Sequence, residues 1–165
     1  MEDKITHDRI NKPGAEDKIF FYPKEFYVFD NFSSFQIEYN GFVFPTSEHA
    51  YQAMKFIKAN PKIFEEIKKA KSAHEAQKLA MKNKDKVDLE WEKNKIHIMK
   101  SILKNKIDQH PYILKKLLQS GEREIIEDSW RDEIWGWGKN KDGKNLLGKI
   151  WMELREEYMN EKKLL

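Results

Sequence analysis

The 165-residue sequence contains no cysteine. Disulfide bonds, catalytic thiolates and cysteine-based zinc sites are therefore excluded, and the composition fits a reducing compartment. There is also no run of about 18 apolar residues that could cross a membrane. The first residues lack the apolar core of a secretory signal peptide. The sequence therefore predicts a cytoplasmic protein without membrane association.

A strong excess of one charge is missing too. The 31 basic residues are opposed by 28 acidic ones, which leaves a formal net charge of +3. Affinity for nucleic acid based on charge alone is therefore not expected. Aromatic residues are abundant by contrast, with ten Phe, six Tyr and five Trp, whereas a disordered chain would lack them. We expect a mobile arm over residues 1–18 and a single folded domain over residues 19–165.

The predicted β-strands are short and rich in aromatic residues. Residues 36–44 contain two alternating runs on either side of Asn40-Gly41, the strongest short signal for a two-residue β-hairpin. Aromatic and β-branched residues predict further short strands, which we place at residues 20–22, 27–29 and 124–127.

Capping residues and apolar spacing predict the helices. Thr46 is the expected N-cap of the first, Pro61 suits the first turn of the second, and Gly121 suits a helix end. After the helix that begins at Thr46, helices are placed at residues 61–69, 72–82, 88–108, 111–120 and 145–158. A Ser72–Glu75 capping box opens the helix at 72–82, and Asn145 opens the last one. In the longest helix, the residues expected to face the core are Ile96, Met99, Leu103 and Ile107. This order predicts an α+β fold dominated by helices, with a small aromatic hairpin unit.

The helix that begins at Thr46 carries polar residues where a plain core helix would not need them. Their spacing places four of them along one face, namely Glu48, Tyr51, Gln52 and Lys55. A carboxylate in the first turn is stabilised by the helix dipole. Glu48 is therefore a candidate acid, base or ligand for sugar hydroxyls. The alternative interpretation is an ordinary solvated helix face.

Three tryptophans and two glycines fall within residues 127–138, in a segment too irregular for a helix. Glycine lets a backbone approach a ligand closely, and indole rings offer flat walls for stacking. Asp132 lies three residues before Trp135, at the rim of such a wall. These tryptophans could equally fill the core, and Trp91, near the start of the long helix, has the pattern of a core residue.

Several segments together resemble the NADAR family, also called YbiA-like, in their order and spacing. They are Phe29-Asp30-Asn31-Phe32, Thr46 to Phe56, Trp91 to Lys95, Asp132 to Gly138 and Gly143 to Gly148, followed by Met152 and Arg155. The resemblance covers residues 20–155, and it is specific because the helix motif and the Asp-x-x-Trp-Gly motif occur together. One position departs from the family. Asp88 stands where members often have Arg, which argues against a phosphate contact from that position.

The resemblance implies hydrolysis of the N-glycosidic bond between a ribose and a base. Known members act on phosphoribosylated pyrimidine intermediates of riboflavin synthesis or remove ADP-ribose from nucleobases. The partners implied are such small molecules or ADP-ribosylated nucleic acid. Carried onto this chain, the resemblance implies a catalytic set of Glu48, Trp91 and Asp132. The implied substrate-binding set is Asn31, Tyr51, Gln52, Lys55, Trp135 and Gly136.

These residue types suit that chemistry. Cleaving a ribosyl C–N bond builds positive charge on the sugar, which one carboxylate can stabilise while a second activates water or protonates the leaving nitrogen. We interpret Glu48 as the base or charge-stabilising group and Asp132 as a ribose ligand or proton donor. Trp91 or Trp135 would stack on the base, and Lys55 would pair with phosphate or form a Schiff base with ring-opened ribose. We expect all five to line one cleft.

No metal or cofactor is expected. His49 lacks a second histidine at the spacing of helical metal ligands, and the glycine-containing segments lack the strand, turn and helix order of a Rossmann site. An alternative function is a non-catalytic module that binds ADP-ribose or a nucleotide through the same polar helix face. Such a module would not need two carboxylates, so the sequence favours an enzyme.

Overall fold

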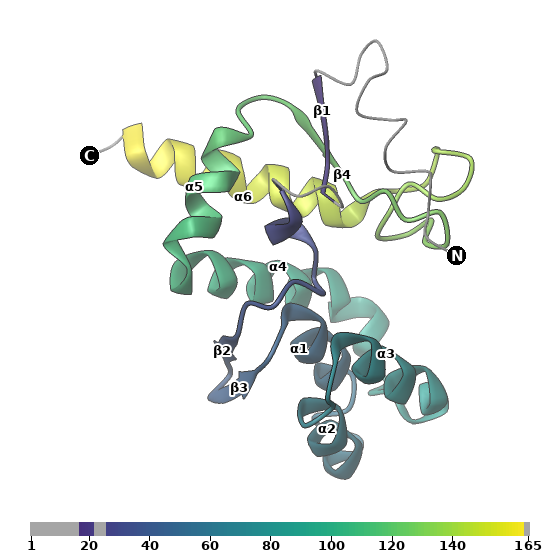
Figure 1. Ribbon diagram of the computed structural model, residues 1–165. Helices are drawn as coiled ribbons and strands as arrows, with labels where there is room; N and C mark the ends of the chain where they lie inside the picture. Colours follow the sequence, from purple (N-terminus) through teal and green to yellow (C-terminus); the bar gives the residue numbers. More distant parts are fainter. Residues whose placement is uncertain (1–16, 22–25, 164–165) are drawn as a thin grey trace. The chain divides into compact units, whose positions relative to one another are not determined.

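The computed structural model describes residues 17–21 and 26–163 (Figure 1). The arm expected over residues 1–18 lies outside them except for its last two residues, and Lys18 begins the first strand. The chain divides into two compact units, which are described separately below. The terminal unit comprises Met1–Asp30 with Tyr112–Leu165, and the central unit comprises Asn31–Pro111.

The central unit is built around one short helix. Helix α1 (Ser47–Met54) packs against four other elements of the unit. They are β3 (Phe42–Phe44), α2 (Pro61–Lys68), α3 (Ala73–Lys82) and α4 (Trp91–Gln109). All eight residues of α1 are buried. The helix that carries the predicted site is thus the core of its unit.

The predicted hairpin is confirmed. Strand β2 (Ile37–Tyr39) pairs antiparallel with β3, and the two turn residues have positive φ angles of 51° at Asn40 and 78° at Gly41. Two successive left-handed residues match the twist of the flanking strands, which is why Asn-Gly favours this turn. The Phe42 ring lies 4.9 Å from that of Phe64 on α2, and this contact anchors the hairpin.

The predicted starts of α1 and α3 are confirmed by their caps. The Thr46 side chain accepts a hydrogen bond from the backbone N–H of His49, and the Ser72 side chain accepts one from that of Glu75. Each cap satisfies one of the backbone donors left free at a helix start. Pro61 occupies the first turn of α2, as expected.

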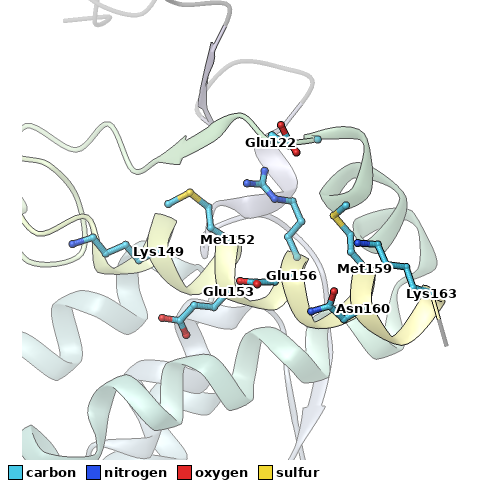
Figure 2. Close-up of a pocket in the computed structure, with 10 residues that line it drawn as sticks. Glu122, Lys149, Met152, Glu153, Glu156, Met159, Asn160 and Lys163 are labelled. Atoms are coloured by element: carbon cyan, nitrogen blue, oxygen red, sulfur yellow. The ribbon is translucent and has the colours of Figure 1, made fainter.

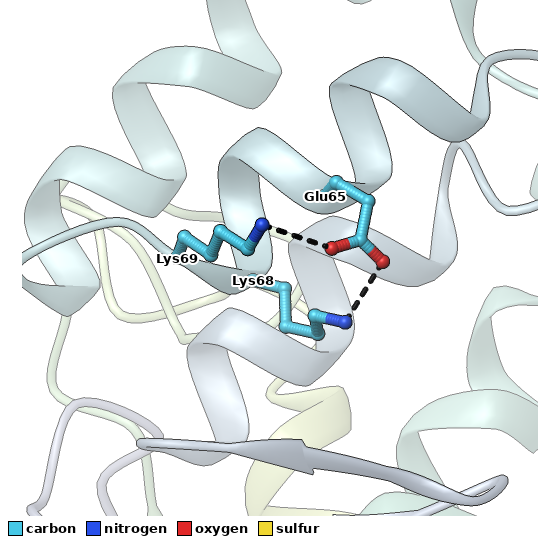
Figure 3. A network of polar contacts seen from close by, with 3 residues as sticks. All are labelled: Glu65, Lys68 and Lys69. Carbon is cyan, nitrogen blue, oxygen red and sulfur yellow. Dashed lines mark hydrogen bonds and ion pairs between the residues drawn. The ribbon is translucent and has the colours of Figure 1, made fainter.

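The lysine-rich surface of α2 has a local role. Glu65 accepts contacts from Lys68 at 2.8 Å and from Lys69 at 3.6 Å (Figure 3). The hydrogen bond from Lys68 lowers the pKa of the Glu65 carboxyl. Because the Glu65 and Lys69 side chains are 43% and 75% exposed, water and salt screen the pairs. They add little to stability and form no site.

The terminal unit combines a parallel strand pair with two helices. Strand β1 (Lys18–Phe20) pairs with β4 (Glu124–Ile126), and α6 (Leu146–Lys163) packs against β4. Helix α5 (Pro111–Gln119) ends before Gly121, which has a φ of +60° as expected for a helix stop. The indole N–H of the buried Trp151 donates a 3.0 Å hydrogen bond to the Phe29 carbonyl.

Two of the strand predictions need correction. Residues 27–29 form a 3-10 turn, in which Phe29 N–H bonds to the Phe26 carbonyl and Asp30 N–H to that of Tyr27. Val28 and Phe29 are both fully buried, whereas a strand would send neighbouring side chains to opposite faces. At residues 20–22, the strand instead ends at Phe20, and residue 22 lies outside the described residues.

The long helix also departs from its prediction. It begins at Trp91 rather than residue 88, because the Asp88 main chain is bonded to the end of α1. Ile96 is 47% exposed and does not face the core. The buried stripe lies further along the helix, nearer β2, and consists of Met99, Ile102, Leu103, Lys106 and Ile107. The buried ammonium of Lys106 donates a 2.9 Å hydrogen bond to Ser33.

Helix α6 starts after Asn145, as predicted, but the Asn145 side chain does not have the predicted capping role. The Asn145 carbonyl accepts the first helical hydrogen bond from Lys149. Its side chain does not cap the helix: it donates to the Ile125 carbonyl and accepts from the N–H of Glu127, both at 2.9 Å. Asn145 therefore ties the helix start to strand β4.

The fold is α+β and dominated by helices, as the sequence predicted. In the part of the chain that the structure describes, none of the helices is both long and apolar enough to span a bilayer.

Candidate active site at the start of helix α1

The backbone N–H groups of Glu48 and of the following residue, His49, are both held by hydrogen bonds. Its own N–H donates a 3.0 Å hydrogen bond to the Asn31 carbonyl, and the Thr46 cap holds the N–H of His49. The residue therefore sits in the first turn of α1, where the partial positive charge of the helix end stabilises a carboxylate.

The Glu48 side chain is buried rather than solvated. It is 5% exposed, and its Oε1 accepts a 2.6 Å hydrogen bond from Nε2 of Gln52, one turn further along the helix. The interpretation of this helix face as an ordinary wet surface is therefore wrong. A buried carboxylate is costly unless it is paired or hydrogen-bonded, so this one is held in place by its surroundings.

Lys55 lies at the other end of α1 against two aromatic rings. Its Nζ is 5.0 Å from the centre of the Tyr51 ring and 5.8 Å from that of Trp91. Burial lowers the pKa of the Lys55 ammonium, with a smaller contribution from Lys95; the negative charges of Glu48 and Glu92 act in the opposite direction. A lysine in such surroundings is neutral more often than an exposed one.

The Trp91 ring packs next to Tyr51 and Lys55. Its ring lies 5.1 Å from that of Tyr51 at an interplanar angle of 61°, and it is 5% exposed. The sequence pattern of a core residue and the resemblance to a site residue are both consistent with this position. The indole packs in the core of the central unit and touches the cation of the candidate site.

Three buried polar atoms at this helix start have no hydrogen-bond partner among the described residues. They are Asn31 Oδ1, Ser47 Oγ and Gln52 Oε1. The Nδ2 group of Asn31 donates a 3.4 Å hydrogen bond to the sulfur of Met99, and this bond orients the side-chain amide. Buried acceptors without partners are costly, so they point to a ligand with hydrogen-bond donors. The sequence pattern does not single out Ser47, although it lies inside the helix motif.

Asp132 and its neighbours form a compact loop in the terminal unit. One Asp132 oxygen accepts hydrogen bonds from the N–H groups of Ile134, at 2.9 Å, and Trp135, at 2.8 Å. A Cβ at Gly136 would lie 2.8 Å from the Glu127 carbonyl oxygen and 2.9 Å from that of Asp132. The glycine is therefore required by the packing of the loop itself.

The structure brings together one part of the predicted site. The gathered residues all belong to the central unit and are Asn31, Glu48, Tyr51, Gln52, Lys55 and Trp91. Asp132, Trp135 and Gly136 belong to the terminal unit. The expectation that the two sets line one cleft stays a prediction.

A separate cavity of about 560 Å³ runs along α6 in the terminal unit (Figure 2). Its walls alternate acidic, basic and methionine side chains, among them Lys149, Met152, Glu153, Glu156 and Met159. None of the site residues predicted from the sequence lines this cavity. Within the described residues, no group of three or more histidine and carboxylate side chains is arranged to hold a metal ion.

Both ring nitrogens of the buried His49 have hydrogen-bond partners. Its Nε2 lies 3.0 Å from the Ala70 carbonyl, which can only accept, so this nitrogen carries the proton. Its Nδ1 then accepts from the Thr46 hydroxyl at 2.8 Å. Burial lowers the pKa of His49, although the Ala70 hydrogen bond and the charge of Glu75 raise it.

This arrangement predicts a pH-dependent stability. Because the folded pKa lies below the unfolded value of 6.5, the contribution of His49 is full above pH 6.5 and is lost as the pH falls from that value through the lower, folded pKa. We expect His49→Gln to cost about 1–3 kcal/mol at pH 7.5, the range for a broken buried hydrogen bond, and to lose less stability than the wild type between pH 7.5 and 5. Urea unfolding at both pH values measures this, with the exposed His97→Gln as control. Equal pH dependence in wild type and His49→Gln would contradict the prediction.

Known proteins are similar to this chain in sequence and in fold. The NADAR domain profile matches residues 19–159, a range that includes parts of both units. The N-glycosidase YbiA of Shigella boydii is 36% identical over 134 residues, which cover 81% of this chain and 82% of that protein. The riboflavin biosynthesis protein PYRR of Zea mays is 37% identical over 147 residues, which cover 81% of this chain and 24% of that protein. The NMR structure of Escherichia coli YbiA superposes with a TM-score of 0.79 at 34% identity, covering 88% of this chain and 86% of that one.

Proposed function

Because the chain belongs to the NADAR domain family, we propose that it hydrolyses the N-glycosidic bond between a base and a ribose that carries a 5-phosphate or an ADP-ribosyl group. The chain is an enzyme of the class that hydrolyses N-glycosyl compounds. The observation that carries the substrate proposal is the buried Glu48 carboxylate, placed beside a lysine and unpartnered hydrogen-bond acceptors.

Glu48 acts on the sugar carbon. As the C–N bond breaks, positive charge develops on the ribose ring, and a preorganised carboxylate in a water-poor site stabilises it strongly. The hydrogen bond from Gln52 holds the carboxylate in a fixed direction, so that it can stabilise the charged sugar or take a proton from water. Asn31 Oδ1 and Gln52 Oε1 accept hydrogen bonds from the ribose hydroxyls.

Lys55 acts as an amine nucleophile. The position of Nζ against two aromatic rings, together with a pKa that burial lowers, favours this role over the alternative of a phosphate contact. Its neutral Nζ attacks C1′ while the bond to the base breaks, and the base leaves with a proton. Ring opening gives an imine, which water hydrolyses to the free sugar aldehyde and the amine. The net reaction consumes one water molecule.

The family resemblance is the reason for including three residues of the terminal unit in the proposed site, namely Asp132, Trp135 and Gly136. Asp132 is the proposed second carboxylate, with one oxygen already committed to the backbone of its own loop. Trp91, Tyr51 and Trp135 are the proposed aromatic contacts of the substrate. Asp132→Asn, which can keep the loop hydrogen bonds, tests this role by its effect on kcat.

The names of the relatives favour a phosphoribosylated pyrimidine as substrate. They include N-glycosidases and proteins of riboflavin biosynthesis. The deciding experiment incubates the protein with a ribose-5-phosphate-linked aminopyrimidine and, separately, with DNA carrying ADP-ribosylated guanine. Release of the free base with ribose phosphate or ADP-ribose supports the proposal. Tight binding of ADP-ribose without cleavage of either substrate would instead support a non-catalytic reader module.

Activity should survive chelators. Attack of water or lysine on the ribosyl carbon needs charge stabilisation and proton transfer, for which the site offers a carboxylate and an amine. We expect the same rate with and without EDTA, and products in which every phosphate link is intact. An EDTA-sensitive rate that a divalent ion restores would point to metal-assisted phosphate chemistry instead.

A further inference from the structure

Asp88 joins the end of α1 to the start of α4. Its N–H donates a 2.8 Å hydrogen bond to the carbonyl of Lys55, the residue at the C-terminal end of α1. Its own carbonyl accepts a 2.9 Å hydrogen bond from the N–H of Trp91, the first residue of α4. Helix ends leave such groups without partners inside the helix, and here a single residue satisfies one at each end.

The Asp88 side chain adds a second connection. Its two carboxylate oxygens accept hydrogen bonds from the backbone N–H groups of Lys58 and Ala59, in the turn that follows α1. The same turn and Asp88 line a cavity of about 380 Å³ together with Trp91. Asp88 thus holds the main chain of Lys55 itself and the turn that follows it.

We propose that Asp88 is a positioning residue, which closes the turn after α1 and thereby holds Lys55 and Trp91 in their relative positions. The inference rests on the amine role proposed above for Lys55. A carboxylate suits this task because it accepts two backbone N–H groups at once, each as a charge-assisted hydrogen bond. An arginine side chain at the same position has only hydrogen-bond donors, so it could not accept a hydrogen bond from either backbone N–H group.

The position of Lys55 can be tested without substrate through the pH profile of its reactivity. In Asp88→Ala the turn opens and Lys55 becomes solvated, so its pKa rises toward the ordinary lysine value of 10.5. Acetylation by acetic anhydride, measured on the Lys55 peptide by mass spectrometry from pH 6 to 11, reports this midpoint. Each unit by which the midpoint rises lowers the neutral fraction, and so the labelling rate at pH 8, about tenfold.

Two variants complete the experiment. Asp85→Ala removes a charge from an exposed residue of the preceding 3-10 turn, and its midpoint should equal that of the wild type. Asp88→Asn keeps one acceptor oxygen, so its midpoint should lie between those of wild type and Asp88→Ala; it also serves if Asp88→Ala does not fold. An unchanged Lys55 midpoint in Asp88→Asn and in any folded Asp88→Ala would overturn the positioning role.

A parallel assay separates this inference from the function on which it rests. Wild-type protein is incubated with ribose 5-phosphate and sodium cyanoborohydride, and the Lys55 peptide is examined for the reduced adduct. Absence of the adduct would overturn the amine role of Lys55. The labelling midpoints of the Asp88 variants would still decide whether Asp88 positions that side chain.

Discussion

Glu48→Gln should fold normally and lose about 10²-fold or more in kcat, the scale observed when one electrostatic stabiliser is removed. The change keeps the size of the side chain and an oxygen that can accept the hydrogen bond from Gln52, so the main loss is the negative charge. That charge counts most in the transition state, where the sugar is positive. Steady-state kinetics on the cleaved substrate and near-ultraviolet circular dichroism measure the two effects.

The matched control is Glu66→Gln. It removes the same charge from an exposed position of α2, and its kcat should equal that of the wild type. If Glu48→Gln turned over at the wild-type rate, Glu48 would have no part in the chemistry. Since Glu48 raises the pKa of Lys55, the variant should also shift the pH profile of Lys55 labelling to lower pH.

Lys55→Met should lower kcat by about 10²–10⁴-fold, the contribution of a positioned proton-transfer or nucleophilic group. Methionine is unbranched and apolar, so it can keep the packing against Tyr51 and Trp91. The variant should therefore remain folded while the amine is lost. Substrate-dependent trapping by cyanoborohydride should disappear with it.

Lys55→Arg distinguishes the two roles of this residue. Arginine keeps the positive charge and can bind phosphate, but it has no neutral amine near pH 7. If Lys55 is the nucleophile, Lys55→Arg will be as inactive as Lys55→Met. If Lys55 only binds phosphate, Lys55→Arg will keep most of the wild-type kcat with a raised KM, and the amine role will be wrong.

Local chemistry was enough to predict much of the fold. The Asn40-Gly41 hairpin and the Thr46 and Ser72 caps depend on the φ angles and hydrogen bonds of residues close in the chain, so the sequence contains the information. The same holds for the helix stop at Gly121. The strand prediction at residues 27–29 is wrong, because packing against residues distant in the chain decides the backbone conformation there. Tyr27–Phe29 reads as a strand by composition, yet it forms a turn with two adjacent buried side chains.

For the site, the sequence by itself determined which residues lie on one face of α1, because helical periodicity fixes that face for Glu48, Gln52 and Lys55. The sequence did not determine whether this face of α1 is exposed to solvent. Only the tertiary structure decided that Glu48 is buried and that Lys55 lies against Trp91, far along the chain. It also assigned Asp88 its contacts with the end of α1. Burial and pKa depend on groups brought together from distant segments, and no local pattern encodes those distances.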